Sequence, residues 1–351
     1  MLVHRVTADE RASKSWVGGV LDSLRRSALR QVCWCLASAD PAVRSSLFSR
    51  LSSSCCRSPR VGGGGGGGTA TPSSLLAGVE SSTGDRDSAG GGSASAAGGS
   101  TPACGGSVGI PSSVGDDILQ RAGEMGCLTT DGVLELLRWC TPRVFSLEGV
   151  SSTVTDALLL RYPAKLCAML EEVWLGWCPH LLEVEAFLLK IRRAGVDGQD
   201  DEPCALRCLD LSGNEGLSDG ILKALAGRCP SLKVLRLDAC PAITGAFLPR
   251  LAQGCPSLTH LSAEASTGLT DSAVATFIME SQAVSSGALR SLRLGGCPVG
   301  SLSAQALLMR GACLRELHLD GCPSLGDAAV GMLCRACPGL LELSLLGCSA
   351  V

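Results

Sequence analysis

Leucine and cysteine recur in one short pattern along the C-terminal two thirds of the chain. The pattern is Cys-Pro-x-Leu-x-x-Leu-x-Leu-x-x-Cys, and residues 229–261 contain a complete copy. The first leucine of each copy stands at Leu206, Leu232, Leu258, Leu289, Leu314 and Leu340. These leucines are 26, 26, 31, 25 and 26 residues apart, and an insertion at residues 280–287 explains the longest interval. A fixed spacing of this size predicts a solenoid of stacked units.

Each copy predicts one short strand followed by one helix. Leu235 and Leu237 alternate with other residues, so the two leucines lie on one face of a strand. The next segment has helical spacing, as in Leu248 and Leu251. One strand and one helix cannot bury an apolar face alone, but stacked copies can. The frame is that of a leucine-rich repeat, so we expect an α/β solenoid with inner parallel strands and outer helices.

Polar residues stand where the expected helices begin. A Ser or Thr followed by Asp occurs at residues 155–156, 218–219 and 270–271. A hydroxyl oxygen in this position can accept hydrogen bonds from the free amides of the first helical turn, and an aspartate complements the positive end of the helix dipole. We therefore interpret these pairs as helix caps rather than as catalytic residues.

Composition divides the chain into three parts. Residues 1–60 form a basic Ser/Arg-rich tail in which residues 20–36 have the spacing of an amphipathic helix, and a mobile tail, an organelle transit segment and a partner-docking helix all stay open for it. Residues 61–115 are Gly/Ser-rich and are expected to form a disordered linker, because they cannot offset the entropy of ordering. Residues 116–351 form the leucine-rich-repeat domain. Its last copy stops after a strand, so we expect the domain to lack a C-terminal cap. Two explanations stay open: the sequence is a fragment of a longer protein, or another chain covers this end.

The chain has 20 cysteines, and most of those in the repeats follow the repeat. One set stands eight residues after the first leucine of its copy, at Cys178, Cys240, Cys297, Cys322 and Cys348, and another closes helices, at Cys229, Cys255, Cys313 and Cys337. Such positions favour small buried side chains. Neighbouring strands are close enough for disulfides, but no secretory signal is visible, so we expect free structural thiols. No histidine stands at ligand spacing from the N-terminal cysteine pairs, and we expect no metal site.

The strand residues beside the inner leucines line the concave face of the expected sheet, and such faces are extended binding surfaces. We predict that a protein partner contacts Trp174, Asp210, Arg236, Asp238, His260, Glu264, Arg293, Glu316, His318 and Asp320. The face is mixed in charge with an acidic bias. Trp174 is the best candidate for an anchor, because buried aromatic side chains dominate interface energetics. Packing of Trp174 against an insertion at residues 182–205, and a sheet face that is merely solvated, are the alternatives.

Several classes of function are not indicated. No apolar run approaches the roughly 18 residues that cross a bilayer, so we expect no membrane partner. Residues 116–351 carry 26 Asp and Glu against 19 Lys and Arg, which argues against nucleic acid. His260 with Glu264, or His318 with Asp320, could imitate a catalytic base with its orienting acid, but no nucleophile or oxyanion motif accompanies them. We therefore expect neither enzymatic activity nor a cofactor.

The repeats resemble those of the cysteine-containing leucine-rich-repeat family, as found in F-box/leucine-rich-repeat proteins, at CPSLKVLRLDACPAIT, CPSLTHL, ACLRELHLDGCPSLGDAAV and CPGLLELSLLGC. The resemblance covers roughly residues 117–351. It implies a right-handed horseshoe and a substrate-recognition subunit of an SCF-type ubiquitin ligase, in which an N-terminal F-box binds the Skp adaptor of a cullin complex. Residues 1–115 contain no recognisable F-box pattern, so a regulatory or structural adaptor outside ubiquitination is the alternative. Both hypotheses are protein-interaction scaffolds of the cytoplasm or nucleus.

Overall fold

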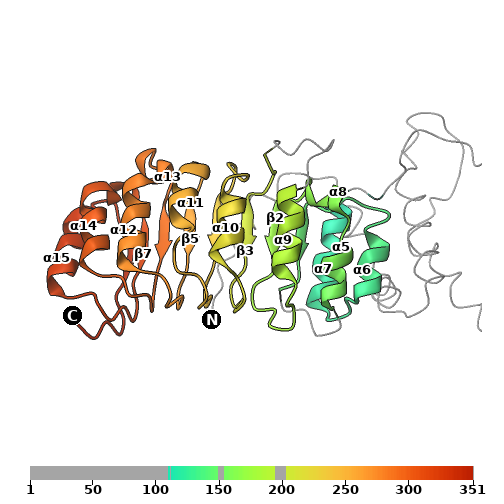
Figure 1. Ribbon diagram of the computed structural model, residues 1–351, viewed down its shortest axis with the longest axis horizontal. Helices are drawn as coiled ribbons and strands as arrows, with labels where there is room; N and C mark the ends of the chain where they lie inside the picture. The colour runs from blue at the N-terminus through green and yellow to red at the C-terminus, as the bar shows by residue number, and fades with distance from the viewer. Residues whose placement is uncertain (1–109, 111, 149–153, 194–202, 351) are drawn as a thin grey trace, which may run out of the picture.

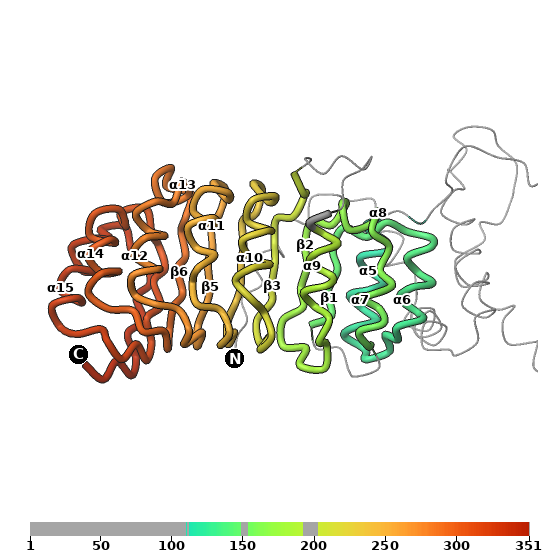
Figure 2. The backbone as a smooth tube through the Cα atoms, in the orientation of Figure 1, coloured from blue at the N-terminus to red at the C-terminus, as the bar shows by residue number. Residues whose placement is uncertain are grey.

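The computed structural model describes residues 110, 112–148, 154–193 and 203–350. The predicted tail and almost all of the predicted linker lie outside these described residues, as does most of the acidic stretch that precedes Leu206. The described residues form an elongated array in which successive repeats lie side by side from one end to the other (Figure 1). Figure 2 shows the backbone as a series of coils along this array.

Within the described residues, eight short strands form a single parallel sheet. They are β1 (Val144–Ser146), β2 (Glu172–Trp174), β3 (Cys208–Asp210), β4 (Val234–Arg236), β5 (His260–Ser262), β6 (Ser291–Arg293), β7 (Glu316–His318) and β8 (Glu342–Ser344). Their order in the sheet is their order along the chain. The central residues of the strands pair in register and form one ladder, namely Phe145, Val173, Leu209, Leu235, Leu261, Leu292, Leu317 and Leu343. The predicted α/β leucine-rich-repeat solenoid is confirmed.

Helices cover one face of this sheet (Figure 1). They are α5 (Ser112–Glu124), α6 (Thr130–Leu136), α7 (Asp156–Arg161), α8 (Ala164–Cys167), α9 (Val184–Arg193), α10 (Asp219–Ala226), α11 (Leu248–Gly254), α12 (Asp271–Glu280), α13 (Gln282–Ser285), α14 (Ser301–Arg310), the 3-10 helix η2 (Gly311–Cys313) and α15 (Asp327–Ala336). The predicted insertion at residues 280–287 contains α13. The apolar residues at helical spacing are buried, as in Leu248 and Leu251 of α11. Their packing against the leucine ladder makes one continuous core.

In five repeats, a cysteine that follows the strand bonds to the preceding repeat. Its thiol donates to the carbonyl oxygen of the last strand leucine or alanine of that repeat, in Cys178 to Leu147 (3.2 Å), Cys240 to Leu211 (3.3 Å), Cys297 to Ala263 (3.0 Å), Cys322 to Leu294 (3.4 Å) and Cys348 to Leu319 (3.1 Å). Asn214 and Ser266 donate from the same position in two described copies that lack this cysteine. Burial raises the pKa of Cys240 to about 11 and of Cys297 to about 12. These thiols are therefore structural donors with little thiolate character.

The prediction of free thiols is wrong at one pair. Cys204 and Cys229 form a disulfide, and their Cα atoms are 5.2 Å apart. The Cys204 amide donates to the carbonyl oxygen of Arg228 at 2.8 Å, which holds the two segments at strand-like spacing. This separation lies within the range that a disulfide requires. The other cysteines that the structure describes are free, as expected.

Helix α5 occupies the position before the first strand and begins slightly before the domain boundary predicted at residue 116. Asp116 Oδ1 accepts hydrogen bonds from the amides of Arg143 (2.9 Å) and Val144 (3.1 Å). In the next repeat the equivalent amides, of Glu171 and Glu172, donate to the backbone carbonyl oxygen of Arg143. Asp116 therefore replaces the backbone carbonyl that a preceding strand would supply, and α5 caps the edge of β1.

The predicted helix caps are confirmed only in part. Thr270 Oγ1 accepts a hydrogen bond from the amide of Ala273 at 3.3 Å, as a cap should. Thr155 and Ser218 make no side-chain hydrogen bond of this kind. The aspartate that follows each of these residues accepts hydrogen bonds from the next repeat instead. The aspartates thus connect repeats and do more than complement their own helix dipoles.

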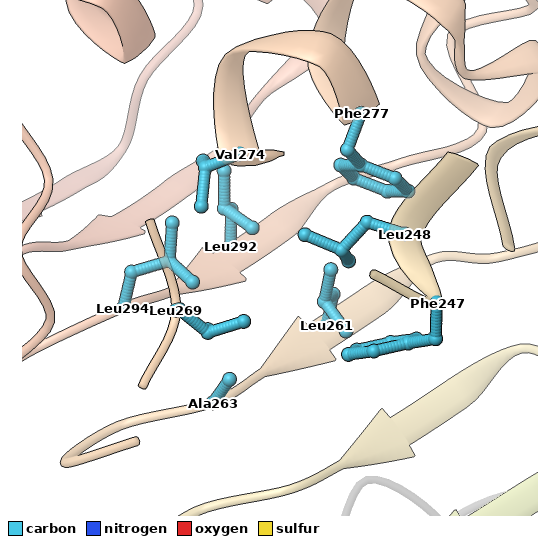
Figure 3. Close-up of a pocket in the computed structure, with 9 residues that line it drawn as sticks. All are labelled: Phe247, Leu248, Leu261, Ala263, Leu269, Val274, Phe277, Leu292 and Leu294. Atoms are coloured by element: carbon cyan, nitrogen blue, oxygen red, sulfur yellow. The ribbon is translucent and has the colours of Figure 1, made fainter. Parts of the chain in front are cut away.

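A small apolar cavity interrupts the core between β5, β6, α11 and α12 (Figure 3). It is lined by Phe247, Leu248, Leu261, Ala263, Leu269, Val274, Phe277, Leu292 and Leu294. Ala263 stands where the repeats on either side have Leu237 and Leu294. The missing leucine side chain at this rung of the ladder accounts for the cavity, because the neighbouring repeats hold the spacing of the stack.

Replacing Ala263 with leucine is expected to raise the free energy of unfolding by about 1 kcal/mol, because the new side chain fills the cavity. Urea unfolding of the full chain measures the change. Ala252 is equally buried but does not line the cavity, so Ala252→Leu is the control and is expected to destabilise by about 1–3 kcal/mol. Equal destabilisation by both substitutions would contradict the explanation.

Candidate protein-binding face

The face of the sheet that bears no helices, here called the open face, is lined by three rows of side chains. The middle row follows from the strand register and contains Ser146, Trp174, Asp210, Arg236, Ser262, Arg293, His318 and Ser344. Of the other predicted contact residues, His260 and Glu316 lie in the row where the strands begin. Asp238, Glu264 and Asp320 lie just beyond the ends of their strands. The structure therefore aligns the predicted residues along one face but divides them into separate groups.

The first group is built around Trp174. Its Nε1 donates to Glu172 Oε2 at 3.1 Å, and the guanidinium of Arg236 lies 5.6 Å from the centroid of its ring. Arg236 Nη1 also lies 3.6 Å from Asp210 Oδ2. The ring is half-buried and held by both neighbours, so it is preorganised on the open face. Packing of Trp174 against the insertion at residues 182–205 stays a prediction, because residues 194–202 lie outside the described part of the chain.

Asp210 is packed more tightly than the sequence suggested. It is 5 % exposed, and a Cβ added at Gly176 would lie 2.7 Å from its Oδ1. Burial raises the pKa of Asp210, although the amide of Ser212 donates to Oδ1 at 2.9 Å and Arg236 opposes the rise. Asp210 therefore positions Arg236 and leaves little of its own surface for a partner.

Asp238 and Asp320 connect neighbouring repeats. Asp238 Oδ1 accepts hydrogen bonds from Ser262 Oγ (2.5 Å) and from the amide of Glu264 (2.8 Å). Asp320 Oδ1 accepts the equivalent bonds from Ser344 Oγ (2.5 Å) and from the Leu346 amide (2.7 Å). One oxygen of each carboxylate is thus committed to the stack, and both residues hold the end of the next strand in place.

The second group lies on β6, β7 and β8. Arg293 Nη2 is 3.7 Å from Glu316 Oε2, and His318 Nε2 is 3.3 Å from Glu342 Oε1. Within the described residues, one set of three side chains that could ligate a metal was found, and it consists of Glu316, His318 and Glu342, whose ligand atoms lie within 4.8 Å of one another. Arg293 already supplies a positive charge beside this set. The negative charge of Glu316 is therefore partly balanced by Arg293.

Neither of the two hypothesised histidine–acid pairs occurs among the hydrogen bonds and ion pairs of the described residues. His260 Nδ1 is hydrogen-bonded to Thr259 Oγ1 at 2.7 Å, and His318 faces Glu342. Burial lowers the pKa of His260, so the ring is neutral at pH 7. Glu264 and Asp320 are thus not the acids beside these histidines, and His318 pairs with Glu342 instead.

Trp177 is a candidate contact residue that was not predicted from the sequence. It follows β2, has a φ of 57° and is 61 % exposed. The residues at the same position in later repeats also have positive φ, and most of them are glycine, namely Gly213, Ala239, Ala265, Gly296, Gly321 and Gly347. A bulky residue in the left-handed region is rare without a specific reason. The signal was visible in the alignment of the copies, where a tryptophan replaces a small residue just before the ladder cysteine.

One family model matches part of the chain, and three solved structures align with it at low identity. A family model described as leucine-rich repeat matches residues 203–226. A chain in the crystal structure of the yeast Rad7 and Elc1 complex aligns with 64% of this chain at 18% identity and a TM-score of 0.47, and the alignment covers 62% of that chain. The tropomodulin C-terminal domain of Caenorhabditis elegans aligns with 44% of this chain at 12% identity, 92% coverage of its own length and a TM-score of 0.34.

An internalin from Listeria monocytogenes aligns with 61% of this chain at 14% identity, 76% coverage of its own length and a TM-score of 0.31. No curated protein matches the chain in sequence. None of the helices that the structure describes is long and apolar enough to cross a membrane. The repeat frame, the sheet and the family match together identify a leucine-rich-repeat domain, which is a scaffold for binding proteins.

Proposed function

We propose that this chain is a substrate-recognition subunit of a Skp–cullin ubiquitin ligase that holds its protein substrate on the open face. The observation that carries the binding role is the open face itself, where Trp174 donates a hydrogen bond to Glu172 and lies against the guanidinium of Arg236. Extended sheet faces of solenoids serve as binding surfaces, and rigid aromatic side chains serve as anchors. The ligase role is supported by the resemblance of the cysteine-containing repeats to those of F-box proteins.

Affinity purification of the tagged full chain tests the ligase role. A Skp adaptor and a cullin are expected to co-purify with the wild-type chain and equally with a Trp174→Ala variant, because the adaptor binds outside the open face. Substrate proteins are expected to be lost from the variant alone. Substrates that depend on Trp174, recovered without any Skp or cullin, would refute the ligase role and support the alternative adaptor outside ubiquitination.

Trp174→Ala is expected to have a large effect on the affinity for the substrate. Truncation of a central aromatic anchor is expected to weaken the affinity for the substrate about 30-fold, which corresponds to about 2 kcal/mol. Calorimetric titration of the purified full chain measures it. Trp139, whose Nε1 bonds to Glu135 on the helix layer, supplies the control Trp139→Ala, which should leave the affinity unchanged. Equal losses in both variants would indicate general unfolding rather than loss of an anchor.

A further inference from the structure

The open face carries an excess of negative charge. Its acidic residues are Glu148, Glu172, Asp210, Asp238, Glu264, Glu316, Asp320 and Glu342, and its arginines are Arg236 and Arg293. Both arginines are already paired with acids of the same face, Asp210 and Glu316. The arginines therefore cannot neutralise the remaining carboxylates, and the surface as a whole attracts cations.

Positive charge is concentrated instead along the edge of the sheet where the strands begin. The exposed basic residues of this edge directly precede their strands and are Arg143, Arg207, Lys233, Arg290 and Arg315. Arg143 Nη1 lies 2.7 Å and Arg207 Nη1 lies 3.4 Å from the oxygens of Glu171, which bridges them. The rows of the open face that carry the acidic residues, here called the acidic rows, thus have these basic residues as a border on one side. A cationic ligand is favoured along the acidic rows and repelled from the basic border.

The protein also shows how this face holds a cationic side chain. Arg236 is placed with its guanidinium over the ring of Trp174 and its Nη1 close to the carboxylate of Asp210. An aromatic face together with a carboxylate is a favourable environment for Arg or Lys. Trp177 exposes a second indole ring just beyond the end of β2. Trp174 and Trp177 therefore favour a cationic ligand for a reason that does not depend on the acidic rows.

Glu264 is an open position on the face. It lies between Asp238 and Asp320 along the row beyond the strand ends, and no ion pair of its carboxylate occurs among the described residues. Burial, followed by the charge of Asp238, raises its pKa. A ligand cation beside Glu264 would relieve this accumulation of like charge.

We propose that the open face binds a lysine- and arginine-rich segment of a protein partner, which lies extended along the acidic rows and places cationic side chains on the tryptophans and on Glu264, Glu316 and Glu342. This inference rests on the proposed function, because it names the class of partner that the receptor takes. A polyanion such as nucleic acid is repelled by the same charges. The basic border keeps the segment on the acidic side of the sheet.

Fluorescence anisotropy with the purified full chain tests the proposal. The probe is a labelled lysine–glycine repeat peptide, and the comparison probe is a glutamate–glycine repeat peptide of the same length. The open-face variant carries Glu264→Gln, Glu316→Gln and Glu342→Gln. The matched control changes net charge equally on the helix side of the molecule, with Glu183→Gln, Glu280→Gln and Asp327→Asn, all exposed.

The wild-type chain is expected to bind the lysine peptide and not the glutamate peptide, with affinity that falls as NaCl concentration rises. The open-face variant should bind about tenfold more weakly and the control less than about twofold. Equal losses in both variants, binding of the glutamate peptide, or no binding by the wild type would overturn the proposal. Self-association of the full chain that disappears in the open-face variant would assign the face to a second copy and would also overturn it.

Failure of the basic-partner proposal can be distinguished from failure of the proposed receptor function. If protein substrates depend on Trp174 in the affinity purification but not on the three glutamates, the receptor function stands and the basic class of partner is wrong. If the substrates depend on both, both inferences are supported together. If neither matters, the open face is not the binding surface.

Discussion

Asp271→Ala is expected to lower the free energy of unfolding by about 3 kcal/mol, because one carboxylate supports the beginning of the next repeat. Asp271 Oδ1 accepts hydrogen bonds from the amides of Gly300 (2.9 Å) and Ser303 (3.0 Å) and from Ser303 Oγ (2.6 Å). Its Oδ2 accepts one from the Leu302 amide at 3.0 Å. Gly300 and Ser303 are buried, so alanine leaves donors without a partner and away from water.

The matched control is Asp327→Ala. Asp327 opens α15 as Asp271 opens α12, and no hydrogen bond of its carboxylate occurs among the described residues. Its replacement is expected to change stability by less than about 0.5 kcal/mol. Urea unfolding of the full-length variants measures both effects. Similar values for the two substitutions would show that these aspartates act only on their own helix dipoles.

The effect of Asp271 should depend on pH. Burial raises its pKa, but the hydrogen bonds from Ser303, Gly300 and Leu302 outweigh burial and hold the pKa below the usual value. A carboxyl group with a lowered pKa in the folded state contributes stability that is complete above the unfolded pKa, about 4, and is lost as the pH falls through the folded value. The difference between the wild type and Asp271→Ala should therefore be constant from pH 7 to about pH 5 and shrink below about pH 4.

The sequence was sufficient to place the strands and the open face. Alternation within a strand depends only on neighbouring residues, and the constant repeat length carries it from copy to copy, so the row from Ser146 to Ser344 emerges in the predicted register. The same locality explains the burial of Leu248 and Leu251 in α11. Features that recur at the same position in every copy could be predicted, because the repeat length fixes that position.

Contacts between copies were harder to predict. Asp116, Asp271 and the disulfide partner Cys229 each act across a distance of about one repeat, and nothing local distinguishes a carboxylate that caps its own helix from one that bonds to the next. The disulfide was judged by compartment rather than by the spacing of neighbouring segments. Helix α5 was missed as a cap because it takes the place of a strand without containing the leucine frame. Predicting such departures from the repeat therefore requires knowing which residues are neighbours in three dimensions, and the repeat length does not give this information.

The close stacking of neighbouring helices predicts a second large effect, at Gly254. A Cβ added to this last residue of α11 would overlap the carbonyl oxygen of Ala226, at the end of α10, and would lie 2.8 Å from its carbonyl carbon. Both atoms belong to backbone, so no side chain can rotate to make room. Gly254→Ala is therefore expected to lower the free energy of unfolding by about 3 kcal/mol, since the two repeats must move apart.

Gly331 provides the matched control, because it lies inside α15 with no heavy atom within 4 Å of an added Cβ. Alanine has the higher helix propensity, so Gly331→Ala is expected to stabilise the chain by about 0.5–1 kcal/mol. Urea unfolding of the full chain should therefore shift in opposite directions for the same chemical change. Destabilisation by both substitutions would contradict the contact at Ala226. Opposite shifts would mean that the helix layer sets the spacing between repeats, and with it the distance between neighbouring side chains within each row of the open face.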